Sequence, residues 1–243
     1  MFMLSYGMQK SASSLINLYA IEIINAAFPS NGQQAFEDLI KRGVIEGVGC
    51  FPWPEMLWRD EEKVKLLLDV AKTEGPFVLK SHMEPPQIVI GYIKKGDAKA
   101  IFSIRDPRDI VSSLIDHGAH NKSLGGGVFE EYTSVDITIP FVREICEAAI
   151  TWIESEIACI FKYHDLVTRP HHEIKRLARH LGADLTEEKL DSIVDAEMNA
   201  RVQWKGTFNK GLLTRHKDEM TPDQVELCSK ELGDYILKLG YSI

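Results

Sequence analysis

The sequence predicts an α/β fold, with a mostly parallel β-sheet flanked by helices. Two observations support this prediction. Short, strongly apolar or β-rich runs alternate with longer amphipathic runs, which is the pattern of buried parallel strands joined by helical crossovers. The chain also has 243 residues, a length that suits one large α/β domain. Because no internal repeat, low-complexity tract or linker-like stretch interrupts the chain, we expect a single domain over residues 1–243.

Four runs have the composition of buried strands: Phe2–Tyr6, Phe77–Lys80, Lys99–Ile104 and Ala158–Tyr163. Amphipathic segments predict helices at Ser13–Ala27, Asp60–Thr73, Pro107–Asp116, Pro140–Glu156 and Pro170–Leu181. A last helix is predicted from Thr221, an N-cap residue followed by Pro222 and, three positions after the cap, by Gln224. It ends at Gly240, and we assign it no chemistry.

Composition and charge limit the possible partners. The chain carries a formal net charge of -8, whereas general nucleic-acid binders usually carry a basic surface. No apolar run approaches the roughly 18 residues of a membrane span, and the N-terminus lacks the pattern of a secretory signal. The four cysteines are far apart and form no Cys-x-x-Cys pair. We therefore expect a reduced, cytoplasmic protein that binds neither nucleic acid nor membrane. The oligomeric state is not predicted.

Polar side chains that can bind a ligand or take part in catalysis lie just after the predicted strands. They are Lys10 and Ser11 after the first strand, Lys80 and His82 after the second, Arg105 after the third and Tyr163 at the end of the fourth. In open parallel sheets, ligands bind at the carboxyl ends of the strands. The pattern therefore predicts one anion-binding site at this edge of the sheet, because cations, hydroxyls and a histidine converge there.

The segment from Tyr6 to Ser14 joins the first strand to the first helix through small residues. Such a turn directs backbone N–H groups and the positive end of the helix dipole at a ligand, and Lys10 adds a full charge. The P-loop signature is not met, because Gln9 occupies the position of the glycine before the lysine. An ordinary kinase or NTPase is therefore disfavoured. A serine-rich helix N-cap beside a surface lysine is the alternative.

A second segment runs from Ile101 to Ser113 and reads as strand, proline turn and helix. Arg105 at the strand end and Ser113, about two turns into the helix, could together grip one phosphate. The alternative is a structural ion pair, either Arg105–Asp109 or Arg108–Asp109.

Together these segments resemble the cofactor-binding motifs of the cytosolic sulfotransferase family, which uses 3′-phosphoadenosine 5′-phosphosulfate (PAPS). Lys10-Ser11-Ala12-Ser13-Ser14 is similar to the family's Lys-Ser-Gly-Thr-Thr loop around the 5′-phosphosulfate. The run from Arg105 to Ser113 resembles the family's Arg-Asn-Pro-[Lys/Arg]-Asp…Ser, which holds the 3′-phosphate. The resemblance implies the family's P-loop-like topology for the whole chain.

Two further motifs follow in the family's order. Lys80-Ser81-His82 resembles Lys-Thr-His, in which the histidine is the catalytic base. The run from Phe161 to Pro170 resembles Tyr-Glu-Asp-[Leu/Met/Ile]…Pro, whose tyrosine, here Tyr163, lies near the adenine. Two positions depart from the pattern. Leu15 stands where the family often has an adenine-stacking tryptophan, and Trp204-Lys205-Gly206 stands in place of Arg-Lys-Gly.

The resemblance implies a role for each matched residue. His82 would act as general base on an acceptor hydroxyl or amine, since an imidazole titrates near neutrality. Lys10 would neutralise the leaving phosphate oxygen and Lys80 the sulfuryl oxygens. The remaining cofactor-binding residues would be Ser11, Ala12, Ser13, Ser14, Arg105, Ser113, Tyr163, Lys205 and Gly206. No metal is expected, because the family needs none. His117-x-x-His120 lacks a third ligand at helical spacing and reads as a solvated loop.

The acceptor is expected to be a small-molecule alcohol, phenol or amine. The aromatic, proline-stiffened run from Cys50 to Trp58 occupies roughly the place of the family's acceptor-lining loop, with Phe51, Trp53 and Trp58 as its aromatic wall. An ordinary hydrophobic loop is the alternative. Two other functions remain open: a non-catalytic nucleotide-binding protein on the same scaffold, and a P-loop-like phosphoryl transferase that uses ATP and Mg²⁺.

Overall fold

The computed structural model describes residues 1–243 except 49–50, 53–56, 58–59, 83 and 204–211. A sheet of four parallel strands lies at its centre, in the order β4-β1-β5-β6. The strands are β1 (Phe2–Gly7), β4 (Phe77–Ser81), β5 (Ala98–Ile104) and β6 (Ala158–Lys162). The predicted α/β class and all four predicted strands are therefore confirmed. A short antiparallel pair, β2 (Gly47–Val48) with β3 (Phe51–Pro52), lies apart from this sheet.

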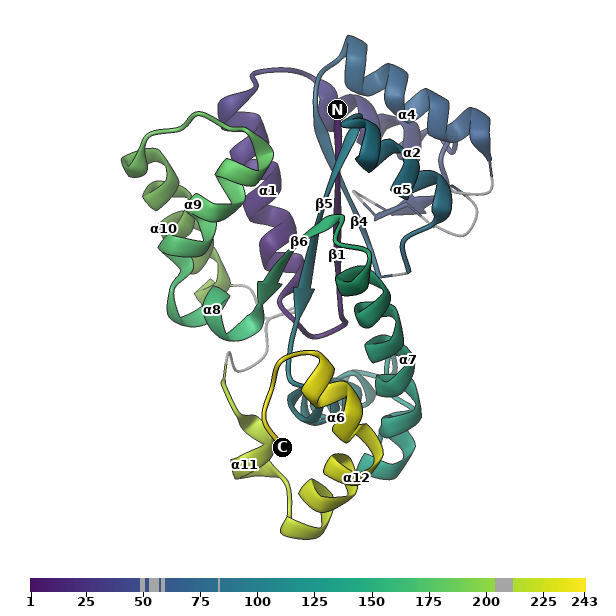
Figure 1. Ribbon diagram of the computed structural model, residues 1–243, viewed down its shortest axis with the longest axis vertical. Coiled ribbons are helices and arrows are strands. Elements are labelled where there is room, and N and C mark those ends of the chain that lie inside the picture. The colour runs from purple at the N-terminus through teal and green to yellow at the C-terminus, as the bar shows by residue number, and fades with distance from the viewer. Residues whose placement is uncertain (49–50, 53–56, 58–59, 83, 204–211) are drawn as a thin grey trace.

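Helices cover both faces of the sheet (Figure 1). One face carries α1 (Ser13–Ala27), α9 (Pro170–Leu181) and α10 (Glu187–Gln203). The other face packs against α2 (Gly32–Lys41), α4 (Glu61–Thr73), α5 (Gln87–Lys95), α6 (Pro107–Ser123), α7 (Val135–Glu154) and α12 (Pro222–Lys238). The short helices α8 (Tyr163–Thr168) and α11 (Arg215–Glu219) follow β6 and precede α12. In Figure 1, α6, α7, α11 and α12 gather beyond the carboxyl ends of the strands.

The two-residue period of β1 explains why the chain builds two cores. Phe2, Leu4 and Tyr6 point into the larger core, whereas Met3 points into the core under α1. All four side chains are fully buried. Because a strand covered on both faces must be apolar at nearly every position, it reads as a continuous hydrophobic run.

Two predicted helix boundaries are wrong. The helix predicted to end at Asp116 continues to Ser123 as α6. The helix predicted to begin at Pro140 begins at Val135, so that Pro140 lies inside α7. A proline there removes the bond to the carbonyl group of Asp136. Asp136 is exposed, so water can replace the missing donor. The predictions also omitted helices at 32–41, 87–95, 163–168, 187–203 and 215–219.

Two helices begin with the capping residues that the sequence indicates. Thr221 and Gln224 form a capping box at the start of α12. Asp106 caps α6 by accepting from the backbone N–H of Arg108, and its carboxylate also pairs with the Arg108 guanidinium. Arg108 donates in turn to the carbonyl of Ser242. The C-terminal segment is thereby attached to the turn that follows β5.

Within the described residues, no helix combines the length and the apolar character that crossing a membrane requires.

Candidate functional site at the carboxyl edge of the sheet

The turn after β1 lies tightly against β5. Gly7 pairs with Ser103 in the parallel register, and a Cβ on Gly7 would lie 2.1 Å from the Ser103 Oγ, so only glycine fits. The Ser11 hydroxyl lies within hydrogen-bonding distance of the Met8 carbonyl at 2.6 Å and of the Ser103 hydroxyl at 2.7 Å. Ser11 is fully buried. Its side chain therefore shapes the turn from inside.

The turn adopts a strained conformation. Lys10 and Ala12 both have left-handed backbone angles, with φ of 65° and 66°. This region costs a residue with a Cβ about 1–2 kcal/mol. Ala12 is the N-cap of α1 and contributes no side-chain cap. The backbone N–H groups of the first turn of α1 therefore have no side-chain cap from that position, as in helix termini that bind anions.

His82 lies just after β4 and contacts the turn directly. Its Nδ1 is 2.6 Å from the carbonyl oxygen of Gly7, so Nδ1 carries the proton and donates it, and the ring's lone pair is on Nε2. Burial and the nearby Lys80 charge lower the pKa of His82 to about 4. The imidazole is therefore neutral at pH 7, the form that can accept a proton.

Lys80, near the end of β4, contacts the first turn of α1. Its Nζ donates a hydrogen bond of 2.7 Å to the Ser14 hydroxyl. Ser13, the residue before Ser14, is buried. Because β4 and β5 flank β1 on either side, the residues after these strands lie around a single turn. The structure thus brings Lys80 and His82 to the turn that carries Lys10.

Arg105 approaches the turn from β5. Its guanidinium donates to the carbonyl oxygens of Lys10 at 3.1 Å and Leu212 at 2.9 Å, and its carbon lies 3.9 Å from the centre of the Tyr163 ring. Arg105 is 4% exposed, yet its buried Nε has no hydrogen-bond partner among the described residues. A buried guanidinium N–H without a partner is costly, so this edge of Arg105 favours an added acceptor.

The ion pair that the sequence left as an alternative is also present. Arg105 lies 3.6 Å from Asp109, whereas Arg108 pairs with Asp106 and Ser242. Asp109 accepts from the backbone N–H and the imidazole of His216. These contacts outweigh burial and lower the pKa of Asp109. The Asp109 carboxylate thus helps to hold the Arg105 guanidinium in place. Ser113 lies buried in the same helix, α6.

Sequence reasoning missed one residue at this edge, His117. It was assigned to a solvated loop, but it lies in α6 and its Nδ1 is 2.6 Å from the Nζ of Lys10. The signal was the four-residue spacing from Ser113, which places both residues on one helix face. Burial and the charges of Arg105 and Arg215 lower the pKa of Lys10 to about 8.

Several predicted site residues fall outside the described residues. These are Trp53, Trp58, Lys205 and Gly206. The backbone of Phe51 belongs to β3. No group of three metal-binding side chains occurs in the part of the chain that the structure describes.

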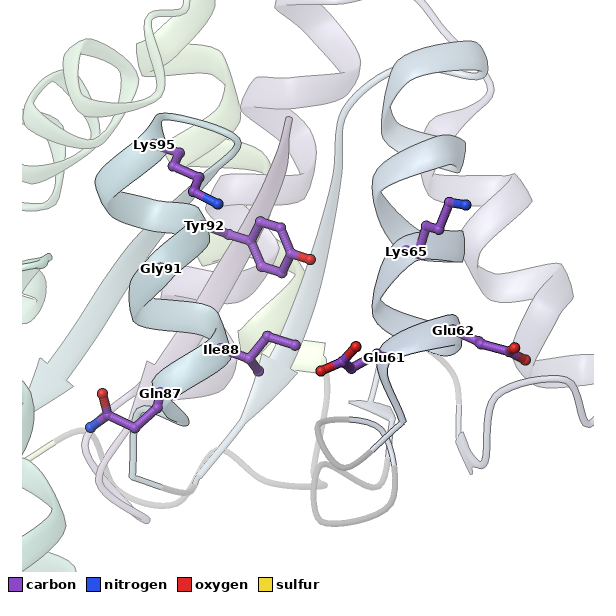
Figure 2. A pocket seen from close by; sticks show the side chains of 8 residues that line it. All are labelled: Glu61, Glu62, Lys65, Gln87, Ile88, Gly91, Tyr92 and Lys95. Atoms are coloured by element: carbon purple, nitrogen blue, oxygen red, sulfur yellow. The ribbon is translucent and has the colours of Figure 1, made fainter.

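A surface groove of about 530 Å³ lies between α4 and α5, away from these residues (Figure 2). Glu61 on α4 points toward Ile88 on α5 across it, and Lys65 on α4 and Tyr92 on α5 also line it. None of the predicted catalytic or cofactor-binding residues lines it, so it is not assigned to the site.

The fold and the edge site define an α/β protein in which Lys80, His82 and Arg105 surround the turn after β1. The sulfotransferase domain family model matches residues 18–232, and the chain therefore belongs to this family. The match begins after the turn at residues 8–12, so the geometry of that turn is an independent observation.

Solved structures share the fold. Retinol dehydratase in complex with androsterone and the inactive cofactor PAP aligns with a TM-score of 0.61 and 18% identity, covering 100% of this chain and 82% of that one. Mouse sulfotransferase SULT7A1 complexed with PAP aligns with a TM-score of 0.65 and 13% identity, covering 97% and 84%. Sulfotransferase STF9 from Mycobacterium avium gives 0.52 and 14%, covering 100% and 77%. The predicted family and fold are confirmed.

Proposed function

We propose that this chain is a sulfotransferase that takes a sulfuryl group from PAPS and transfers it to a hydroxyl or amine of a small-molecule acceptor. The observation that carries the proposal is the attachment of two residues to one turn. His82 donates to the Gly7 carbonyl and Lys80 donates to the Ser14 hydroxyl. A base and a cation are therefore fixed beside the N-terminus of α1, where an anion binds well.

The residues at the edge fit a nucleotide with two phosphate positions. The N-terminus of α1 with Lys10, Ser13 and Ser14 suits the 5′ end, with Ser11 and Ala12 shaping the turn. Arg105 suits the 3′-phosphate through its Nε, which has no hydrogen-bond partner among the described residues, with Ser113 on the adjoining helix. Tyr163 supports the guanidinium by stacking, and Lys205 and Gly206 complete the proposed set. The PAP bound to two of the neighbouring structures supports this class of ligand.

Bound PAPS supplies the activated sulfuryl group. Sulfuryl transfer, like phosphoryl transfer, requires in-line positioning and neutralisation of oxygen charge more than covalent catalysis. Lys80, held by Ser14, neutralises charge on the transferring oxygens, and Lys10 does so on the leaving oxygen. His82 accepts the acceptor's proton at Nε2, because its Nδ1 proton is held by Gly7. A bound anion raises the pKa of the ring from about 4 and strengthens it as a base.

The acceptor is proposed to be a small alcohol, phenol or amine. The aromatic segment with Phe51, Trp53 and Trp58 is proposed to line its pocket, since aromatic walls favour flat or apolar ligands. The androsterone in the retinol dehydratase complex is an apolar alcohol, in keeping with this class of ligand.

Two measurements test the function. Calorimetry compares the binding of adenosine 3′,5′-bisphosphate (PAP) with that of ATP–Mg²⁺, and a transfer assay follows sulfate incorporation from labelled PAPS into a panel of phenols, alcohols and amines. We expect PAP to bind and at least one acceptor to be sulfated. Binding of ATP–Mg²⁺ alone would indicate a phosphoryl transferase. Binding of PAP with no transfer to any acceptor would indicate a non-catalytic protein.

The base is tested by His82→Ala. We expect about a 10²–10⁴-fold loss of kcat with little change in PAP affinity, while the exposed His171→Ala control keeps wild-type rates. A correctly folded His82→Ala variant with wild-type kcat contradicts the role of His82.

A further inference from the structure

The Lys10 ammonium contacts a side chain that belongs to none of the cofactor-binding motifs described above. Lys10 Nζ lies 2.6 Å from Nδ1 of His117. Lysine has only donors, so Nδ1 is the acceptor and the ring proton is on Nε2. Burial, Lys10 and His120 lower the pKa of His117, and the ring is therefore neutral at pH 7. A neutral acceptor can orient an ammonium group without cancelling its charge.

The imidazole of His117 is held in place by its neighbours. The Phe129 ring packs edge-on against it, with centroids 5.5 Å apart at 83°. The backbone of Phe129 lies so close to α6 that a Cβ on Gly118 would be 2.1 Å from its carbonyl oxygen. The Asn121 side chain donates to the Val128 carbonyl at 2.8 Å. The loop at 124–134 is thus attached to α6, and it fixes the ring that receives Lys10.

The charges around this pair come from the end of β5, from α11 and from α6 itself. Arg105 from the end of β5 and Arg215 from α11 both oppose the charge on Lys10, while Asp116 on α6 favours it. Asp116 is itself paired with Arg215, which also contacts Glu219. On α6, the charge of His120 also lowers the pKa of His117. The nearest carboxylate is therefore largely engaged by an arginine, and His117 is the group that directly accepts from Lys10.

We propose that His117 is a positioning residue for Lys10. By accepting a hydrogen bond from Nζ at Nδ1, His117 orients the Lys10 ammonium group beside the turn and keeps it in the charged form. The inference rests on the proposed function in one respect, because it assigns Lys10 to an anionic ligand. A carboxylate at position 117 would orient Lys10 equally well but would repel that anion. A neutral acceptor retains the net positive charge that the ligand needs.

The link between the two side chains is tested without any ligand. Protein labelled with ¹³C at lysine Cε is titrated by NMR, and the Lys10 signal is identified as the one missing from Lys10→Met. We expect Lys10 to titrate near pH 8. In His117→Leu its pKa should fall by about one unit, because an acceptor that favours the ammonium is lost. In His117→Asn it should stay near the wild-type value, since the amide oxygen can accept in place of Nδ1. An unchanged Lys10 pKa in His117→Leu overturns the proposal.

The functional consequence is tested by PAP affinity between pH 6 and 10. Wild type should lose affinity above about pH 8 as Lys10 loses its proton. In His117→Leu this loss should begin about one pH unit lower, with about a threefold weaker affinity at pH 7.5, and His117→Asn should restore the profile. His171→Leu, the same substitution at an exposed histidine that takes no part in this pair, is the control. A uniform loss of affinity at all pH values, with no shift, would indicate a merely structural role and overturn the proposal. If wild type binds no PAP, the proposed function fails, while the NMR titration still decides the His117–Lys10 link.

Discussion

Lys80 and Ser14 join two elements that are far apart in the sequence. The Lys80 ammonium on β4 donates a 2.7 Å hydrogen bond to the Ser14 hydroxyl in the first turn of α1. The adjoining His82 is fixed to the Gly7 carbonyl on β1. A serine near a helix N-terminus often only caps the helix. The hydroxyl of Ser14 in addition orients the Lys80 ammonium group across the turn.

Replacing Ser14 with alanine should reduce transfer through Lys80. A hydrogen bond to a charged group contributes about 1.5–3 kcal/mol, so we expect kcat to fall about tenfold in Ser14→Ala. Ser14→Thr retains the hydroxyl and should remain within about twofold of wild type. Steady-state kinetics with PAPS measure both variants. Equal rates for Ser14→Ala and wild type would show that the Lys80–Ser14 bond does not assist the reaction.

Tyr163 should act through Arg105. The guanidinium stacks on the ring at 3.9 Å, and a desolvated cation–π contact is worth about 2 kcal/mol. We expect Tyr163→Leu to weaken PAP binding about tenfold by calorimetry, whereas Tyr163→Phe keeps the ring and should bind nearly as wild type. If Tyr163→Phe loses as much affinity as Tyr163→Leu, the hydroxyl and not the stacking is the important group.

Ala12 offers a test of the strained turn by stability alone. Its φ is 66°, where a Cβ costs about 1–2 kcal/mol and glycine loses about 0.5–1 kcal/mol of backbone entropy. Ala12→Gly should therefore raise the free energy of unfolding by about 1 kcal/mol, and Tm by about 3 °C for a chain of this length. Ala196→Gly, an exposed change within α10, should lower stability by about 1 kcal/mol. A lower Tm in Ala12→Gly would mean that the turn relaxes without strain.

The sequence predicted the sheet because its strands are buried on both faces and are therefore apolar at almost every position. It predicted the edge site for a related reason: parallel strands place the residues that follow them at one edge, and Lys10, His82 and Arg105 do meet there. Helix boundaries were harder to predict. The helix predicted to end at Asp116 continues to Ser123, and the close approach of Phe129 to α6 requires glycine at position 118. That long-range contact has no local sequence signal.

Other omissions have local causes. The helix α10 carries charges on several sides, and its buried residues Leu190, Ile193 and Val194 give only a short apolar stripe. The helix α5 follows two prolines, and its apolar run resembles a strand.

The contact between Lys10 and His117 joins residues more than 100 positions apart and depends on the left-handed backbone at Lys10. Neither feature can be inferred from residue types alone.

The titration of His82 connects its geometry with stability and rate. Its pKa falls from an ordinary 6.5 to about 4 in the folded chain, so between these values the unfolded state binds more protons than the folded state. Stability should therefore be fully present above pH 6.5 and fall as the pH drops toward 4, by at most about 3 kcal/mol from this group. In His82→Asn, which can still donate an N–H to Gly7, this fall should be smaller. Urea unfolding at pH 7 and pH 4.5 measures the difference.

The lowered pKa of His82 also sets the acid limb of the pH profile of kcat/KM. A base must be unprotonated, and His82 stays unprotonated down to about pH 4, so kcat/KM should remain nearly constant from pH 7 to pH 5. An ordinary histidine would lose most of its activity over that range. His171→Asn, an exposed change, controls for general titration in both experiments. If kcat/KM instead declines with a midpoint near 6.5 while the unfolding experiment shows the expected fall, the base is a group other than His82, because the two measurements would then report different residues.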